Sequence, residues 1–212
     1  KLLNMKKKYY LNYFDSINTG LNNSQFFIKD LNTVPEIFFE EMKIIFNKLR
    51  LNHNNIYFLG NGASSAFSNH MALDFSKNGK ILSRSLSDSA MLTALSNDYS
   101  FEDSMLEFIK MEGITVEDLV ITISSSGNSP NIISVLNYCK KNKIKTLALS
   151  GLKADNKSIS LSNYSIYVPM KTYGMVECIH QIFLHLMLDE SMEIFEWDRK
   201  DYQDMNVNNY NI

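Results

Sequence analysis

Short apolar runs alternate with longer amphipathic stretches along most of the chain after residue 52. Apolar runs that end in glycine, serine or asparagine are typical of buried strands. They predict five strands, over residues 56–59, 81–86, 119–123, 145–150 and 164–168. Helical character marks residues 63–77, 90–95, 130–142 and 173–193. Strands that alternate with helices indicate a parallel sheet covered on both faces, a three-layer α/β fold.

Residues 6–51 carry aromatic and aliphatic side chains at helical spacing, with Leu31 four positions after Phe27. Pro35 interrupts this stripe, because proline disfavours the helical conformation in the residue before it. We therefore predict a pair of helices over residues 1–52 that belongs to the same domain as the rest. The α/β part covers residues 53–195, and a polar, asparagine-rich tail covers 196–212.

Length and charge narrow the class of protein. A chain of 212 residues with 45% apolar residues can build one core of about 150–200 residues, but not two large domains. The formal charge of −2 provides no field for nucleic acid or an anionic membrane. The longest apolar run is interrupted by His180, Gln181 and His185, so we expect no membrane span, and we expect no secretory leader. Cys139 and Cys178 are too few for a disulfide framework. We expect a soluble, cytoplasmic protein.

Two strand-to-helix loops carry the candidate chemistry. The first runs from Gly60 to Ser65 and the second from Ser124 to Ser129. Glycines, serine hydroxyls and a helix N-terminus suit a phosphate or a carboxylate. Each loop alone could be an ordinary turn, with Ser129 as a helix cap. Both would open on the same edge of the sheet, and neither contains a lysine, which favours a small sugar phosphate over a nucleoside triphosphate.

Spacing also groups possible metal ligands. His70 and Asp74 lie four apart on one predicted helix, and Glu177 and His185 lie eight apart on another. Each pair shares one side of its helix, and two imidazoles with two carboxylates form a plausible zinc set. A surface His–Asp pair would have the same spacing. His180 points away from His185 and is expected in the core or an interface, whereas Gln181 shares the face of His185 as an alternative amide contact.

Several blocks together resemble the sugar isomerase (SIS) family, and within it the sedoheptulose 7-phosphate isomerases, also called phosphoheptose isomerases. They are Gly-Asn-Gly-Ala-Ser at 60–64, His70, Leu-Thr-Ala-Leu-Ser-Asn-Asp-Tyr at 92–99 and Ile-Ser-Ser-Ser-Gly-Asn-Ser-Pro-Asn at 123–131. The resemblance covers residues 56–190. It implies the SIS fold, with a five-stranded parallel sheet between helices, and a homotetramer with sites between chains, to whose interface the N-terminal helices contribute.

The resemblance assigns roles to individual residues. It implies one zinc ion per subunit held by His70, Asp74, Glu177 and His185, with Asp74 as the catalytic base and His185 as its acid/base partner. The sequence departs from the family twice, because Asp74 replaces a glutamate and Glu177 replaces a glutamine. Asp74 is one methylene shorter, a loss of reach of roughly 1.5 Å where about 1 Å can matter. Glu177 adds a negative charge that should strengthen zinc binding and could displace a substrate hydroxyl.

The implied reaction is ketose–aldose isomerisation of sedoheptulose 7-phosphate to D-glycero-D-manno-heptose 7-phosphate through an enediol, for lipopolysaccharide or capsule heptose. The serines are expected to hold the phosphate: Ser64, Ser124, Ser125, Ser126 and Ser129. The remaining substrate contacts are assigned to Asn61, Gly62, Asn97, Asp98 and Glu177.

Two alternatives stand beside the enzyme. One is a non-catalytic SIS protein, like the relative that binds the replication initiator DnaA. That relative lacks the acidic residue at Asp74 and the histidine at His185, so both positions favour the enzyme. The other is a sugar-phosphate sensing module, which we do not favour because we expect no DNA-binding segment in this protein.

Overall fold

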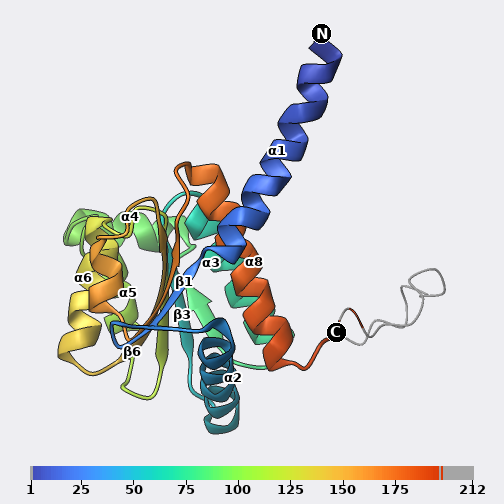
Figure 1. Cartoon of the computed structure of the whole chain (residues 1–212). Coiled ribbons are helices and arrows are strands. Elements are labelled where there is room, and N and C mark those ends of the chain that lie inside the picture. Colours follow the sequence, from blue (N-terminus) through green and yellow to red (C-terminus); the bar gives the residue numbers. More distant parts are fainter. Residues whose placement is uncertain (1, 196, 198–212) are drawn as a thin grey trace.

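The computed structural model describes residues 2–195 and 197, and the side chains from residue 8 onward within that range. The predicted tail, 196–212, lies outside the described residues except for Trp197. Figure 1 shows a twisted sheet flanked by helices, with one long helix projecting from the body. The helices are α1 Leu2–Asn22, α2 Pro35–Asn52, α3 Ala63–Lys77, α4 Ser89–Asp98, α5 Ser104–Met111, α6 Pro130–Lys141, α7 Lys157–Leu161 and α8 Tyr173–Ser191. The strands are β1 Gln25–Ile28, β2 Leu31–Thr33, β3 Ile56–Gly60, β4 Ser83–Ser85, β5 Leu119–Ser124, β6 Lys145–Gly151 and β7 Tyr164–Val168.

The described strands form one sheet in the order β2-β1-β7-β6-β5-β3-β4. The five strands from β7 to β4 are mutually parallel, which confirms the predicted three-layer α/β fold with its five parallel strands. The central strands are fully buried because helices cover both faces, and this explains their continuous apolar runs.

An antiparallel hairpin, β1–β2, extends this sheet, and here the prediction of helix was wrong. Phe26 of β1 pairs with Ile166 of β7, so the hairpin continues the sheet beyond its parallel part. Its loop consists of Lys29 and Asp30, with φ of 50° and 67°. Two residues with positive φ are typical of a type I′ hairpin turn. The turn lacks the usual Asn-Gly sequence, and the apolar residues of this segment recur at helical spacing, so the sequence predicted a helix.

Element boundaries differ from the prediction mainly on the α4–α5 side. The fourth strand is shorter than residues 81–86, and α4 is longer than residues 90–95, so that Asn97 and Asp98 lie in its last turn. Helices α5 and α7 were not predicted. The predicted helix over residues 63–77 is confirmed at both ends.

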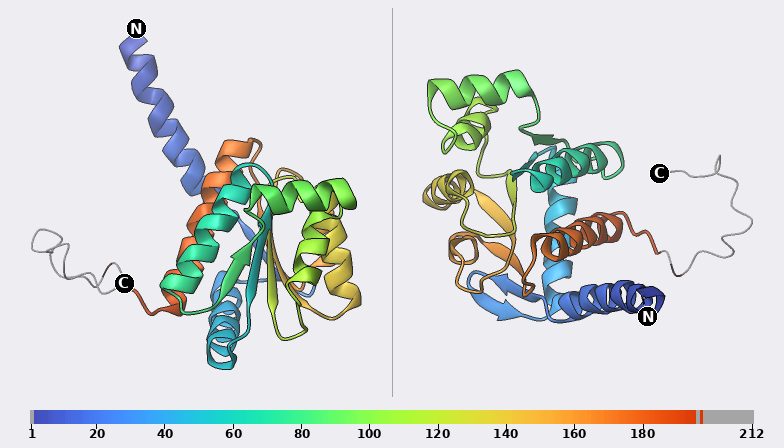
Figure 2. Two further views of the ribbon diagram at one scale, coloured as in Figure 1. Left: turned by 180° about the vertical axis from the view of Figure 1, so that it is seen from behind. Right: turned by 90° about the horizontal axis from the view of Figure 1, so that it is seen from above.

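Two helical layers enclose the sheet (Figure 2). Helices α2, α3 and α8 pack on one face around a large apolar cluster, and α4, α5 and α6 pack on the other around a second cluster. The strand order reverses between β3 and β5, because β4 lies on one side of β3 and β5 to β7 lie on the other. Ligands of open α/β sheets bind at such a switch point, beyond the carboxyl ends of the strands.

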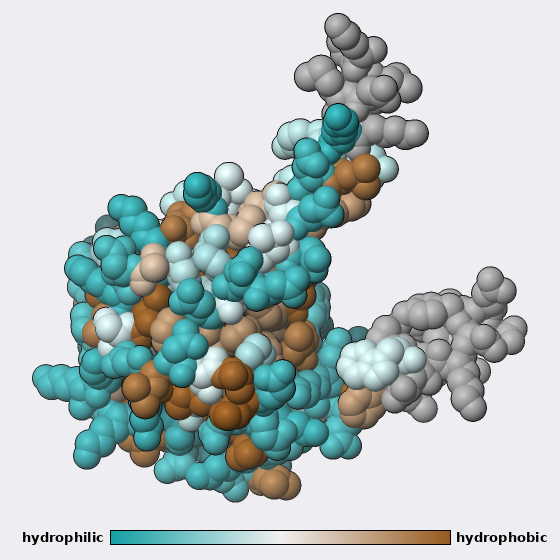
Figure 3. All heavy atoms as spheres, in the orientation of Figure 1, coloured by the Kyte–Doolittle hydropathy of each residue, from teal (hydrophilic) through white to brown (hydrophobic). Residues whose placement is uncertain are grey.

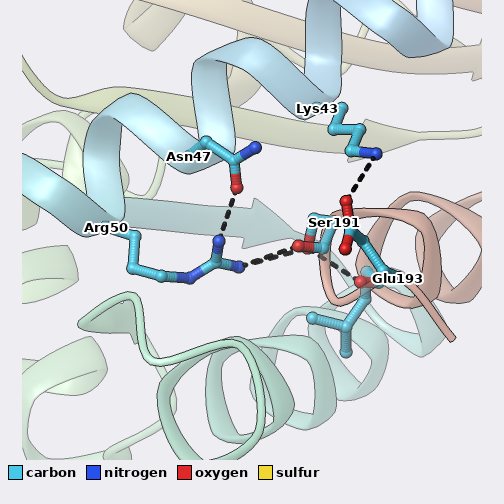
Figure 4. Close-up of polar contacts among 6 residues, drawn as sticks. Lys43, Asn47, Arg50, Ser191 and Glu193 are labelled. Atoms are coloured by element: carbon cyan, nitrogen blue, oxygen red, sulfur yellow. Dashed lines mark hydrogen bonds and ion pairs between the residues drawn. The ribbon is translucent and has the colours of Figure 1, made fainter.

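Polar contacts fix the end of α8 to α2 (Figure 4). The Arg50 guanidinium donates to the Ser191 carbonyl at 3.3 Å and to the Asn47 side chain. Lys43 forms an ion pair with Glu193 at 3.2 Å. Because α8 carries predicted site residues, these contacts help to set its position. Among the described helices, none has both the length and the unbroken apolar character that a bilayer span needs.

Candidate functional site at the sheet switch point

A pair of amides at the switch point joins the loop after β3 to the first turn of α6, the helix that follows the loop after β5. Asn61 Nδ2 donates to Asn131 Oδ1, and Asn131 Nδ2 donates to Asn61 Oδ1, both at 2.9 Å. Asn131 also accepts the backbone N–H of Ile132 at 3.0 Å, inside the first turn of α6. The two loops that the sequence identified are therefore held side by side at one edge of the sheet.

A small cleft of about 100 Å³ lies beside these loops. This serine cleft brings together seven of the predicted substrate contacts with two residues that the sequence analysis did not select, Ile123 and Tyr173. The predicted ones are Asn61, Ser64, Ser124, Ser125, Ser126, Ser129 and, from the first turns of α8, Glu177. Tyr173 lies four residues before Glu177, on the same side of α8. None of the described residues that line this cleft is a lysine or arginine.

The serine hydroxyls of this cleft are not consumed by capping. Ser129 is the N-cap residue of α6, but its side chain makes no capping hydrogen bond. Its Oγ faces Ser124 Oγ at 3.3 Å. Ser125 Oγ is buried with no partner among the described residues. An orphaned buried hydroxyl is costly, so these side chains favour a ligand-binding loop over an ordinary turn.

Glycines give both loops their shape. A Cβ on Gly60 would lie 2.7 Å from the Cβ of Ser64, so only glycine lets the first turn of α3 approach β3 this closely. Gly62 and Gly127 have φ of 57° and 60°, the left-handed region that glycine favours. Gly62 lies at the turn into α3 and does not line the serine cleft, and its contact with substrate stays a prediction.

A possible metal-binding group lies further along α3 and α8. Ligand atoms of His70, Asp74 and His185 lie within 4.8 Å of one another. His70 Nε2 is 3.3 Å from Asp74 Oδ2, and the rings of His70 and His185 have their centroids 5.3 Å apart. Helices α3 and α8 pack together, and this brings His185 close to His70 and Asp74, which lie more than a hundred positions earlier in the sequence. Two imidazoles and one carboxylate form a donor set that can hold a divalent metal ion.

Two further residues of α8, Glu177 and Gln181, lie in different surroundings. Glu177, predicted as a metal ligand, lies outside the metal-binding group of the described residues and lines the serine cleft instead. Gln181 lies between Glu177 and His185, and its Nε2 is 2.8 Å from His185 Nε2. Its Oε1 is buried and has no partner among the described residues. Gln181 therefore lies beside His185, one of the three possible metal ligands.

The structure places the remaining predicted residues away from the cleft. Asn97 and Asp98 are exposed at the end of α4, where Asn97 Nδ2 donates to Asp98 Oδ1 at 3.0 Å. Neither lines the serine cleft, and their contact with substrate stays a prediction. His53 is an exposed residue at the C-terminal end of α2, as expected for a surface loop.

His180 is fully buried in the core, which confirms one of its two expected locations. Its Nε2 hydrogen-bonds the Ser150 carbonyl at 3.1 Å, at the end of β6. The next residue, Gly151, donates its N–H to the Ser125 carbonyl at 3.0 Å. Burial lowers the pKa of His180 to about 4, and the bond to Ser150 opposes this only in part.

This buried histidine predicts a pH-dependent stability. In the unfolded chain His180 is protonated below pH 6.5, whereas in the folded protein it is protonated only below about pH 4. The contribution of neutral His180 to the free energy of unfolding is therefore complete above pH 6.5 and falls as the pH drops. We expect the stability difference between wild type and His180→Gln, from urea unfolding, to shrink by about 2 kcal/mol from pH 7 to pH 5. Equal pH dependence in both proteins would contradict this assignment.

Comparisons with known proteins agree with these features. Residues 40–151 match the SIS domain family. Phosphoheptose isomerase 2 of Campylobacter jejuni is 30% identical over 76% of this chain and 81% of its own length. The phosphoheptose isomerase of Helicobacter pylori strain P12 is 29% identical over 76% of this chain and 85% of its own length.

A solved structure shares the fold. The phosphoheptose isomerase from Francisella tularensis superimposes with a TM-score of 0.74 and 19% identity, covering 91% of this chain and 99% of that one. Because the family match covers more than half of the chain and the Campylobacter relative reaches 30% identity over most of its length, the chain belongs to the SIS domain family and, within it, to the phosphoheptose isomerase group.

Proposed function

We propose that this protein is an isomerase that interconverts sedoheptulose 7-phosphate and D-glycero-D-manno-heptose 7-phosphate through an enediol. One observation carries the proposal. The serine cleft and the His–Asp–His group lie along the same two packed helices, α3 and α8. The first provides hydroxyls for a phosphate, and the second provides a carboxylate and imidazoles for proton transfer.

The phosphate end belongs in the serine cleft. Ser124, Ser125 and Ser129 offer hydroxyls there, and the N-terminus of α6 lies beside them. A helix N-terminus adds backbone N–H groups and a partial positive charge that favour an anion. Glu177 faces the same cleft, and its carboxylate opposes a phosphate unless it binds a sugar hydroxyl instead.

The spacing of the two groups suits a long sugar. Glu177 and His185 are separated by two turns of α8, about 12 Å along the axis. An extended chain grows by about 1.2 Å per bond, so the path from the carbonyl carbon of a heptulose 7-phosphate to phosphorus spans about 8 Å. Side chains at either end cover the remainder. A pentulose 5-phosphate is two bonds shorter and reaches less of this separation.

Asp74 is the proposed base. Its half-buried carboxylate accepts the proton from the carbon beside the carbonyl and returns it to the neighbouring carbon. His185 moves the protons at the two oxygens. A carboxylate has two oxygens that accept hydrogen bonds, so Asp74 can contact a metal ion and still act as a base.

The proposed metal is zinc, held by His70, Asp74 and His185. Nitrogen and carboxylate ligands in a near-tetrahedral arrangement are typical of this ion. When bound, zinc would supply Lewis-acid polarisation of the carbonyl and hydroxyl oxygens.

The substrate assignment is tested by a panel of ketose phosphates. Sedoheptulose 7-phosphate, fructose 6-phosphate, ribulose 5-phosphate and unphosphorylated sedoheptulose are each incubated with the zinc-loaded protein, and aldose formation is followed. We expect kcat/KM to be highest for sedoheptulose 7-phosphate and at least about 100-fold lower without the phosphate. A protein that binds these sugars without turnover would instead be a sugar-phosphate sensor or a non-catalytic SIS protein.

The proposed product would serve lipopolysaccharide or capsule heptose synthesis. We place the reaction in the cytoplasm, since doubly charged sugar phosphates do not cross membranes unaided.

We further propose a homotetramer in which α1 contacts other copies of the chain. Helix α1 projects from the body in two views, and its aromatic side chains at Tyr9, Tyr10 and Phe14 are 72%, 47% and 61% exposed. Figure 3 shows apolar side chains on the projecting helix. Such a patch marks an interaction surface when it is this extended.

Negative charges introduced on α1 test whether this helix holds the oligomer together. We expect the double variant Tyr10→Glu with Phe14→Glu to lose the mass of four 24.4 kDa chains in size-exclusion chromatography with light scattering, because buried carboxylates are costly. Leu51→Glu is the control, since Leu51 is equally apolar and 78% exposed at the end of α2. A wild-type protein with the mass of one chain would overturn the proposal.

A further inference from the structure

We infer that Ser158 of α7 is a positioning residue, which orients the serine loop (residues 124–129) for the phosphate. This rests on the proposed function, because it concerns how the phosphate-binding loop is held. Ser158 is only 1% exposed and does not line the serine cleft. It therefore acts through the loop and not by contact with substrate.

Two hydrogen bonds from Ser158 reach one atom of the serine loop. The carbonyl oxygen of Gly127 accepts the Ser158 hydroxyl at 2.8 Å and the Ser158 N–H at 3.1 Å. The next loop residue, Asn128, accepts the N–H of Lys157 on its side-chain oxygen at 3.0 Å. The start of α7 thus holds the middle of the loop with residues that do not line the cleft.

A second carbonyl group of the loop is held from the same segment of the chain. The Ser125 carbonyl accepts the N–H of Gly151, the last residue of β6, at 3.0 Å. Gly151 and Ser158 are the two ends of one segment, residues 151–158, that connects β6 to α7. This connecting segment therefore binds alternate carbonyl groups of the serine loop.

Peptide geometry converts these contacts into an orientation of the loop. In a trans peptide, the carbonyl group and the N–H of the next residue point in opposite directions. Both held carbonyl groups point toward the connecting segment, so the N–H groups of Ser126 and Asn128 point away from it. The Asn128 N–H reaches Ser126 Oγ at 3.2 Å, and Ser126 lines the cleft. The loop is therefore held with N–H groups, and not these carbonyl oxygens, toward the cleft.

This orientation matters because none of the described residues that line the cleft is a lysine or arginine. Hydroxyl and N–H dipoles then bind the anion, and their effect depends on their direction. A carbonyl oxygen turned into the cleft would repel a phosphate. Glycine adopts φ of either sign, so Gly127 does not by itself fix the direction of its own carbonyl group. The two donors of Ser158 supply that constraint.

Ser162 provides a matched control for Ser158. It is also buried, at 7% exposed, and it follows the last residue of α7. Its hydroxyl donates to the Ser158 carbonyl at 2.8 Å. Ser162→Ala therefore removes the same kind of buried hydrogen bond as Ser158→Ala, but not one that reaches the serine loop.

The test measures KM and kcat for sedoheptulose 7-phosphate with the zinc-loaded protein. Its Kd is measured by calorimetry in the Asp74→Asn background, where turnover is suppressed. We expect Ser158→Ala to raise KM and Kd by about 10-fold, the effect of one lost hydrogen bond. We expect kcat to stay within about threefold, because the phosphate is bound alike in the ground and transition states. Ser162→Ala should leave all three values within about twofold.

Asn128→Ala is a second variant, in which an exposed side chain is removed. It breaks the bond from the Lys157 N–H and should raise Kd by at least about threefold. Thermal unfolding should shift similarly in Ser158→Ala and Ser162→Ala, so that a difference in affinity reports the loop and not general stability.

Two results would overturn this inference alone: equal Kd values for Ser158→Ala and Ser162→Ala, or wild-type affinity in Asn128→Ala. A fall in kcat with unchanged KM in Ser158→Ala would also contradict it. If sedoheptulose 7-phosphate is neither bound nor turned over by the zinc-loaded wild type, the proposed function fails together with the inference.

Discussion

Replacing Asp74 with asparagine is expected to lower kcat by about 10²- to 10⁴-fold, the usual contribution of a general base. Asparagine keeps the shape of the side chain beside His70 Nε2, 3.3 Å away in the wild type, but it cannot accept a proton from carbon. The measurement is the rate of aldose formation from sedoheptulose 7-phosphate at saturating zinc, with bound metal quantified in the same samples. Variants with equal metal content isolate the loss of the base from the loss of a ligand.

Asp74→Glu is the matched control. It retains the carboxylate but moves it by roughly 1.5 Å, and a displacement of about 1 Å can cost about 100-fold. We expect its activity to lie above that of Asp74→Asn. Asp74→Asn with more than a tenth of wild-type activity would rule out Asp74 as the base.

Replacing Gly127 with alanine is expected to have the largest effect on the serine loop. Gly127 has φ of 60°, which costs an alanine about 1–2 kcal/mol. Its added Cβ would also overlap the side chain of Asn156. That side chain is buried and cannot easily move, because its Nδ2 donates to the Lys153 carbonyl at 2.7 Å and to Ser150 Oγ at 3.2 Å.

Gly113→Ala is the control that separates the cost of the positive φ from the cost of the overlap with Asn156. Gly113 has φ of 74°, but a Cβ there would meet nothing within 4 Å. We expect urea unfolding to give a loss of about 1 kcal/mol for Gly113→Ala and about 3 kcal/mol or more for Gly127→Ala. KM for the sugar phosphate should rise at least about 10-fold only in Gly127→Ala. Equal destabilisation by both would show that Asn156 yields to the new methyl group.

The sequence pattern predicted an element correctly where residues within that element determine its structure. The helix predicted over 63–77 agrees with α3 at both ends, where Gly62 and Asn78 are the cap residues. The hairpin at Lys29-Asp30 was missed, because its turn has two residues with positive φ but no glycine to mark it in the sequence. Tertiary pairing overrode the apparent helical period of that segment.

At the candidate site, too, the sequence pattern did not predict which distant segments lie together. Spacing predicted that His70 and Asp74 share a face of α3, but only the packing of α3 against α8 brings His185 to them. The family resemblance supplied that juxtaposition. It also assigned Glu177 to the metal, whereas the backbone places that residue two turns from His185 and in the serine cleft. Only the structure shows which α8 side chains share a site with α3 and which line the serine cleft.

The central claim is tested most directly by solvent exchange. Zinc-loaded wild-type protein and Asp74→Asn are incubated with sedoheptulose 7-phosphate in deuterated water, with and without a chelator, and followed by proton NMR. We predict that the wild type forms the aldose and incorporates deuterium at the carbon beside the carbonyl, and that the chelator and Asp74→Asn each suppress both. A wild-type protein with bound zinc that yields neither aldose nor deuterium exchange would contradict the account.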